Sequence, residues 1–152
     1  MKILMICLGN ICRSPLAQGI LEQKVKNNKL DWYVDSAGTH GGHVGLHPDN
    51  RSLDTAMQHG IDISAQEARR IQPADLQKFD LIYCMDSRNY ADVIEMCHTL
   101  AEEAKVKMIM NEVEAKKNMS VPDPYYGGAE GFENVYQMLD RACDAIIKNY
   151  SK

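Results

Sequence analysis

Two residues near the start of the chain have the types and spacing needed for chemistry on a phosphate group. Cys7 and Arg13 are separated by five residues within the string CLGNICRS, which spans residues 7 to 14. A cysteine thiolate is a strong nucleophile, and an arginine guanidinium can bind two phosphate oxygens at once. The pair therefore predicts a loop that binds an oxyanion and attacks it with sulfur.

The segments on either side of this loop indicate how it is held. The apolar residues 3 to 6 predict a buried strand, and the sequence from Pro15 onward predicts a helix. A turn that leads into a helix N-terminus gathers unpaired backbone N–H groups, and the helix dipole favours an anion there. The same dipole and the charge of Arg13 favour the thiolate form of Cys7. We expect a phosphate-binding loop directly after the first strand.

Strand and helix patterns alternate along the rest of the chain. Short apolar runs predict strands, and apolar residues at helical spacing predict helices, the last of which runs to the C-terminus. The expected strands span residues 32–36, 80–85 and 106–110, and the expected helices lie at 48–60, 73–76 and 132–147. A polar turn at residues 86–89 is expected to lead into a further helix that has Val93, Ile94, Met96 and Cys97 on one side. Such alternation predicts an α/β fold with a parallel sheet flanked by helices on both faces, and ligands bind at the carboxyl ends of such strands. Cys7, Ser36 and the pair Met85-Asp86 stand at three of these ends.

Composition restricts the class of protein. The length of 152 residues fits a single domain, 1–152. The net charge of −4 and the scattered basic residues argue against a nucleic-acid partner. We find neither an apolar run long enough to span a membrane nor a signal segment, which predicts a cytoplasmic protein without a membrane partner. The five cysteines include no C-x-x-C pair, so we expect free thiols and no metal site.

A longer string and a second motif make the chain resemble a known family. The string CLGNICRSP close to the N-terminus, together with DPYYGG from Asp123, resembles the low-molecular-weight protein tyrosine phosphatases. The resemblance extends from Met1 to about Tyr150. It implies a four-stranded parallel sheet of order 2-1-3-4 and a protein-tyrosine-phosphatase that needs no cofactor. A phosphotyrosine-containing protein is the implied substrate, a tyrosine kinase is one candidate partner, and a monomer or weak dimer is expected.

The resemblance also assigns roles to individual residues. Cys7 is the expected nucleophile, which forms a cysteinyl-phosphate, and Arg13 binds the phosphate and stabilises the transition state. Asp123 is the expected general acid and then general base, although an isolated Asp-Pro would indicate only a turn. Substrate or phosphate contacts are expected from Leu8, Gly9, Asn10, Ile11, Cys12, Ser14, Tyr125 and Tyr126. Cys12 is either a packing residue or a redox-sensitive thiol that forms a reversible disulfide with Cys7.

A supporting network is expected behind the loop. Asn10 stands where a residue that tolerates positive φ is needed, and in the family an Asn side chain meets a serine and a histidine. Ser36 matches the serine, whereas Gln66 occupies the place of the histidine. Ser14 is either an N-cap or a donor to the nucleophilic sulfur, and the two roles are compatible.

One wall of the pocket departs from the family pattern. Many relatives read GWHVG where this chain reads GGHVG at residues 41 to 45, so Gly42 replaces an aromatic residue and we expect this side to be more open. Tyr125 and Tyr126 are expected to stack on an aryl substrate. The nearby histidines at 40, 43 and 47 form no fixed metal-binding pattern, and no metal is expected.

Three other functions share part of this pattern. An arsenate reductase needs further cysteines that reach the first, but Cys84 and Cys97 lie in a strand pattern and a helix pattern. A phosphoarginine phosphatase of the same family tends to carry threonine in place of Ile11. A non-catalytic phosphate-binding module would have little use for a nucleophile and a general acid together, so phosphotyrosine hydrolysis is the favoured interpretation.

Overall fold

A four-stranded parallel sheet organises the chain, of which the computed structural model describes residues 1–125 and 127–151. Its strands are β1 (Lys2–Cys7), β2 (Tyr33–Gly38), β3 (Leu81–Cys84) and β4 (Val106–Met108). They pair in the order β2-β1-β3-β4, with β1 at the centre between β2 and β3. The expected parallel sheet and its order 2-1-3-4 are confirmed.

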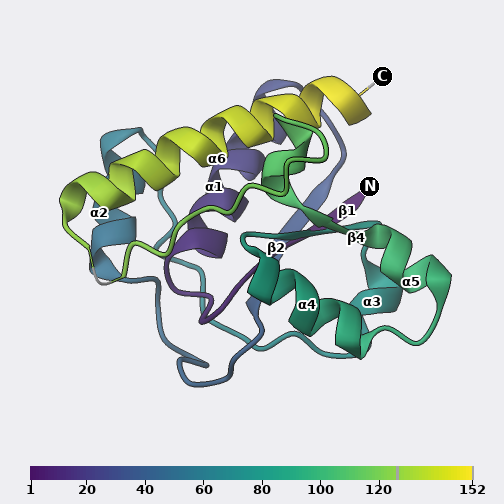
Figure 1. Ribbon diagram of the computed structural model, residues 1–152. Coiled ribbons are helices and arrows are strands. Elements are labelled where there is room, and N and C mark those ends of the chain that lie inside the picture. The colour runs from purple at the N-terminus through teal and green to yellow at the C-terminus, as the bar shows by residue number, and fades with distance from the viewer. Residues whose placement is uncertain (126, 152) are drawn as a thin grey trace.

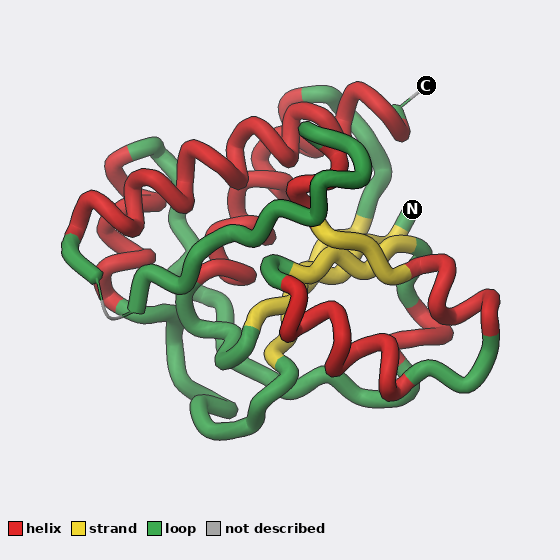
Figure 2. The backbone as a smooth tube through the Cα atoms, in the orientation of Figure 1, coloured by secondary structure: helices red, strands yellow, loops and turns green. Residues whose placement is uncertain are grey.

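Helices cover both faces of this sheet, as predicted (Figures 1 and 2). One face is covered by α1 (Arg13–Asn27), α2 (Asn50–Gln58) and α6 (Ala129–Tyr150). The other is covered by α3 (Asp75–Lys78) and α4 (Ser87–Met96), with α5 (Leu100–Lys105) packed beside α3. A short 3-10 helix, η1 (Ile109–Glu112), follows β4 and packs against α6.

The central strand shows why the sheet must be covered twice. Ile3 and Met5 point into the layer beneath α1 and α6, whereas Leu4 and Ile6 point into the layer beneath α3 and α4. All four side chains are completely buried. Burial of each contributes roughly 1.5–3 kcal/mol, so a strand with four consecutive apolar residues is stable only between two helical layers.

Three elements differ from the sequence-based expectation. Helix α4 begins at Ser87, within the stretch expected to be a polar turn, because the Asp86 side chain accepts a hydrogen bond from the Asn89 N–H and caps the helix there. The predicted strand at 106–110 ends at Met108, because the chain turns into η1 at Ile109. Helix α5 was not predicted, because it buries only Glu102 and therefore carries no apolar periodicity. It is instead stabilised at its start by the Thr99 side chain, which accepts a hydrogen bond from the Glu102 N–H.

Candidate active site

The loop between β1 and α1 forms a cradle of backbone donors. The N–H groups of residues 8 to 12 have no acceptor among the described residues. Asn10 adopts the left-handed conformation predicted for it, with φ of 58°. The end of β2 holds the loop closely: a Cβ at Gly38 would lie 2.7 Å from the Leu8 carbonyl oxygen, so only glycine fits there. The free N–H groups give the loop the donors that an oxyanion requires.

The sulfur of Cys7 is contacted from behind by a serine. Ser14 Oγ lies 3.0 Å from Cys7 Sγ and accepts a hydrogen bond of 2.7 Å from Asn10 Nδ2. Because Ser14 Oγ is already an acceptor toward Asn10, its own O–H is available to donate to the sulfur, which favours a thiolate. The N-cap position of α1 is occupied by Cys12, so the prediction that Ser14 caps the helix is wrong and its role as a donor to sulfur is the one that the geometry supports.

The rest of the supporting network is only partly as predicted. Asn10 Nδ2 also donates to Ser36 Oγ at 3.0 Å, and Asn10 Oδ1 accepts from the backbone N–H of Arg69 at 3.0 Å. Ser36 in turn donates to Gln18 Oε1 at 2.6 Å. The prediction that Gln66 closes this network is wrong, because the Gln66 amide donates to the Pro15 carbonyl at 3.1 Å. Gln18 takes the outer place instead. It lies one turn of α1 after Ser14, on the same side of the helix, and so reaches Ser36.

Arg13 is fixed by two groups that are distant in sequence. Its Nη1 donates to Asp86 Oδ2 at 2.7 Å and to the Val121 carbonyl at 3.0 Å, and its side chain is only 3% exposed. Burial alone would lower the pKa of Arg13, but Cys7, Asp86 and Asp123 outweigh it and raise that pKa above its ordinary value. The guanidinium therefore stays charged, with one of its nitrogens held in a fixed place.

Asp123 lies across the cavity from the loop. Its Oδ2 is 3.7 Å from Arg13 Nη2, and its Oδ1 accepts a hydrogen bond of 3.0 Å from the Tyr125 N–H. The Asp123 side chain is 39% exposed, so substrate and water can reach it. Tyr125 stands at the mouth and is 37% exposed, with the Arg51 guanidinium 5.3 Å from its ring centre. Tyr126, the other predicted stacking residue, lies outside the described residues.

These side chains surround one cavity of about 280 Å³. Its lining consists of Cys7, Leu8, Gly9, Ile11, Cys12, Arg13, His40, His43, Asp123 and Tyr125. Asn10 and Ser14, which were predicted to contact substrate or phosphate, have their side chains behind the loop, so they can contact a ligand only through the backbone. The three proposed catalytic groups, by contrast, face the same space.

Two histidines form the wall beside Gly42. The rings of His40 and His43 line it, and the Gly42 N–H donates to His40 Nδ1 at 3.0 Å. His43 packs so closely on the loop that a Cβ at Gly9 would lie 2.8 Å from its ring. His43 is part of the pattern that this chain shares with the relatives that read GWHVG, so the greater openness expected from Gly42 stays a prediction. In the described part of the chain no group of three or more His, Cys, Asp or Glu side chains could hold a metal ion.

Three other cysteines have thiols whose pKa is raised by burial. Burial and the Asp49 carboxylate raise the pKa of Cys12 to about 12, although the residue lines the cavity. Cys84 and Cys143 are completely buried, and burial raises the pKa of both thiols. Cys84 belongs to the layer on the opposite side of the sheet from Cys7, so it cannot reach the nucleophile.

Sequence reasoning missed two contributors to the site. Asp86 was noted only as a strand end, yet it orients Arg13, and the carboxyl end of β3 was the signal that could have found it. Gln18 carried no signal in the sequence, because many helices present a glutamine. The histidines at 40 and 43 belong to the segment 40–45 that was expected to form one wall, and their rings do line the cavity.

Comparison with known proteins agrees with this geometry. A family model described as low molecular weight phosphotyrosine protein phosphatase matches residues 2–152. The human protein of that name is 37% identical over 150 residues, which cover 97% of this chain and 94% of the human one. The crystal structure of a protein tyrosine phosphatase from Entamoeba histolytica, with Hepes in its active site, is similar with a TM-score of 0.93 at 34% identity over 99% of this chain and 97% of that one. A Drosophila arginine phosphatase reaches a TM-score of 0.93 at 33% identity over 100% and 99% of the two chains.

The fold and these matches define the class of the protein as a phosphatase, a hydrolase. Within that class, the chain belongs to the low molecular weight phosphotyrosine protein phosphatase family. The predicted family and the predicted enzyme class are confirmed. No helix in the described part of the chain has the length and apolar character needed to cross a bilayer.

Proposed function

We propose that this protein hydrolyses phosphotyrosine in proteins, with Cys7 as nucleophile, Arg13 as phosphate ligand and Asp123 as general acid and base. The observation that carries the proposal is the convergence of all three side chains on one cavity whose loop presents unpaired N–H groups. Loop donors and a fixed guanidinium supply the charge stabilisation that a phosphoryl group needs. The cavity requires no cofactor for this role.

In the first half-reaction the Cys7 thiolate attacks phosphorus. The S–P bond forms as the P–O bond to the tyrosine ring breaks, and Asp123 gives its proton to the departing phenolate. Ser14 stabilises the thiolate before attack through its contact of 3.0 Å with the sulfur. The product of this step is a cysteinyl-phosphate, held by Arg13 and the loop N–H groups.

In the second half-reaction Asp123, now a carboxylate, takes a proton from water. The oxygen of that water attacks phosphorus and the S–P bond breaks, which releases inorganic phosphate and returns the thiolate. The exposure of the Asp123 side chain supports this role, because water can approach it from the cavity mouth. Its Tyr125 N–H partner holds one carboxylate oxygen and leaves the other facing the cavity.

The substrate class rests on the cavity and its mouth. Leu8 and Tyr125 are exposed apolar side chains at the rim, where the ring of a phosphotyrosine would contact them. The likeness to a Drosophila arginine phosphatase makes phosphoarginine the second candidate. Ile11 lines the cavity of this chain, and the absence of a threonine there supports phosphotyrosine.

The surroundings of the site support the remaining proposals. Arsenate reduction is disfavoured, because Cys84 and Cys143 are buried and Cys84 lies on the other side of the sheet from Cys7. All five cysteines are free thiols, which supports a reducing, cytoplasmic location.

We propose that residues 1–152 form one phosphatase domain, which acts as a monomer or weak dimer. Its proposed substrate is a phosphotyrosine-containing protein, and a tyrosine kinase is one candidate. Sedimentation velocity would measure the oligomeric state directly.

Steady-state kinetics test the assignment. We expect Cys7→Ser to lose turnover of p-nitrophenyl phosphate while it still binds inorganic phosphate, because the loop and Arg13 are retained. Cys97→Ser is the matched control, since Cys97 lies at the end of α4 outside the cavity, and it should keep full activity. Unaffected turnover in Cys7→Ser would overturn the assignment. A phosphotyrosine peptide compared with a phosphoarginine peptide, in wild type and Ile11→Thr, decides between the two substrates.

A further inference from the structure

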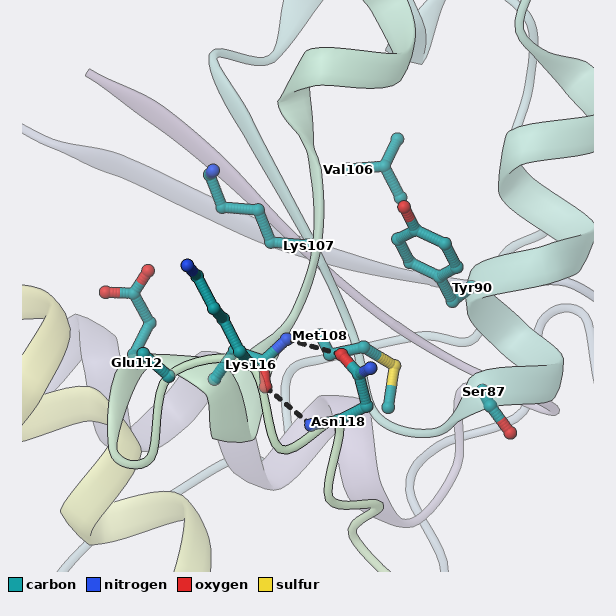
Figure 3. A pocket seen from close by; sticks show the side chains of 10 residues that line it. Ser87, Tyr90, Val106, Lys107, Met108, Glu112, Lys116 and Asn118 are labelled. Atoms are coloured by element: carbon teal, nitrogen blue, oxygen red, sulfur yellow. Dashed lines mark hydrogen bonds between the residues drawn. The ribbon is translucent and has the colours of Figure 1, made fainter.

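A second cavity, of about 610 Å³, opens at the β4 edge of the sheet (Figure 3). Three segments form it: the start of α4, strand β4, and the stretch from η1 to residue 118. Its lining residues are Ser87, Tyr90, Val106, Lys107, Met108, Asn111, Glu112, Ala115, Lys116 and Asn118. The volume is within the range of small-molecule sites and is about twice that of the proposed active site.

The charges of this cavity are unbalanced toward the positive. Neither Lys107 nor Lys116 forms an ion pair or a hydrogen bond through its side chain within the described part of the chain. The one acid in the lining, Glu112, is already an acceptor: it receives hydrogen bonds from Asn149 at 2.9 Å and Tyr150 at 3.5 Å, both from α6. Two lysines against one glutamate leave the lining with a net positive charge, and within the described residues neither ammonium group is paired with a carboxylate.

The cavity is also divided into a charged side and an apolar side. Figure 3 shows both ammonium groups on one side, with the Tyr90 ring and Ser87 on the other. Val106 and Met108 are almost completely buried and provide an apolar floor. The hydroxyl groups of Ser87 and Tyr90 have no partner among the described residues. An aromatic molecule with one anionic group would satisfy both sides.

The wall opposite α4 is held by hydrogen bonds within the chain. Asn111 and Asn118 exchange two hydrogen bonds, from Asn111 Nδ2 to Asn118 Oδ1 at 2.9 Å and from the Asn118 N–H to Asn111 Oδ1 at 2.8 Å. This reciprocal pair closes the intervening stretch into a loop. A ligand would therefore lose little free energy to ordering of the protein.

Both walls of the cavity lead directly to the groups that hold Arg13. Ser87 is the neighbour of Asp86, whose carboxylate accepts from Arg13 Nη1. Asn118 lies three residues before Val121, whose carbonyl accepts from the same nitrogen. The Val121 N–H donates to the Met85 carbonyl at 2.7 Å, which ties the two walls together beneath the cavity. A ligand that bridges them would brace the arrangement of Arg13 seen here.

We propose that this cavity is a second ligand site, that it takes a small aromatic molecule with one anionic group, and that its occupant strengthens phosphate binding at Arg13. Lys107 and Lys116 would bind the anionic group, and the ring would pack between Tyr90 and the apolar floor. By thermodynamic linkage, phosphate in the active site must strengthen binding of the second ligand by the same factor.

Amide NMR with 2-naphthoate as the probe tests the proposal. The ¹⁵N-labelled protein is titrated with 2-naphthoate, first without and then with saturating inorganic phosphate in the active site. We expect saturable shifts at the amides of Tyr90, Lys107 and Asn118, and a Kd that falls about fivefold when phosphate is present. The Ki of phosphate against p-nitrophenyl phosphate should fall by the same factor when 2-naphthoate is saturating.

Charge-removing variants provide the controls. Lys107→Gln with Lys116→Gln should weaken 2-naphthoate binding by at least about tenfold, because two charged contacts are lost. Lys26→Gln removes an exposed lysine from α1 and should leave the Kd unchanged. Shifts confined to residues 8–14 and 40–43, absence of saturable binding, or equal Kd in the double variant would overturn the site. Binding without a change in the Ki of phosphate would overturn its coupling to Arg13.

Discussion

Ser14→Ala tests how much the contact behind the nucleophile contributes to catalysis. Ser14 Oγ is completely buried, lies 3.0 Å from Cys7 Sγ, and is oriented by the Asn10 amide at 2.7 Å. Alanine removes the O–H and leaves the rest of the helix turn intact. The thiolate then loses its only side-chain donor within the described network, both before attack and when it leaves the cysteinyl-phosphate.

The size of the effect follows from the kind of bond that is lost. A hydrogen bond to a charged acceptor contributes about 1.5–3 kcal/mol, which corresponds to a loss of about 10- to 150-fold in kcat. The stability cost is smaller, about 1 kcal/mol, because Asn10 keeps Ser36 as an acceptor of its amide. A large loss of rate with a small loss of stability is the expected signature.

Two other serines supply the comparison. Ser36→Ala removes the next member of the network, which contacts Asn10 and not the sulfur, so we expect a loss of less than about fivefold in kcat. Ser52→Ala removes an equally buried serine whose hydroxyl donates to the Cys12 carbonyl at 3.3 Å, and kcat should change by less than about twofold.

The assay is steady-state hydrolysis of p-nitrophenyl phosphate, with urea unfolding measured on the same samples. The reasoning fails if Ser14→Ala changes kcat by less than about twofold while its free energy of unfolding stays near that of wild type. It also fails if Ser36→Ala and Ser14→Ala lose activity equally, since the effect would then come from loop geometry and not from the bond to sulfur.

Three further predictions concern the cavity and its rim. After peroxide treatment, a thiol reductant should restore activity in wild type but not in Cys12→Ser, because a disulfide with Cys7 protects the nucleophile from irreversible oxidation; equal recovery would reject this role for Cys12. Gly42→Trp should sharpen the discrimination among aryl phosphates, as measured by kcat/KM over a substrate series, since it adds an aromatic wall beside the loop; an unaltered profile would contradict it. Asp49 caps α2, and its pKa is lowered, mainly by the side chain of Arg51. Its contribution to stability is therefore complete at neutral pH. That contribution is lost as the pH falls below the pKa of an unfolded aspartate, about 3.9, and then through the lowered pKa of the folded state. Asp49→Ala should therefore reduce the free energy of unfolding by about 1 kcal/mol at pH 7 and by clearly less at pH 3 in urea titrations, and a constant difference at both pH values would count against the ion pair.

Much of the fold was predictable because its signals are local. The apolar run of β1, the loop after it and the helix from Pro15 follow one another within a short segment, so their order and chemistry can be read directly. The alternation of strands and helices predicted a parallel sheet covered on both faces. Helix α5 escaped prediction because its stability comes from a capping threonine and acidic first-turn residues, not from an apolar face.

The partners of the loop could not be predicted in the same way. Arg13 is held by Asp86, which is 73 residues away, and by the Val121 carbonyl, which is 108 residues away. Gln18 and not Gln66 contacts Ser36, because α1 places the Gln18 amide next to that serine. Several polar side chains in the sequence were equally plausible partners. Spacing along the chain gives no measure of such distances.

The sequence by itself therefore determined the proposed nucleophile, its arginine and the loop that joins them, because a strand, a turn and a helix N-terminus are contiguous and bring their own backbone donors. Only the tertiary structure decided how Arg13 is oriented, where Asp123 faces it, and that the rings of two histidines line the cavity beside the loop. Those contacts are made by packing of distant segments against the sheet, and packing selects among residues that the sequence leaves equivalent.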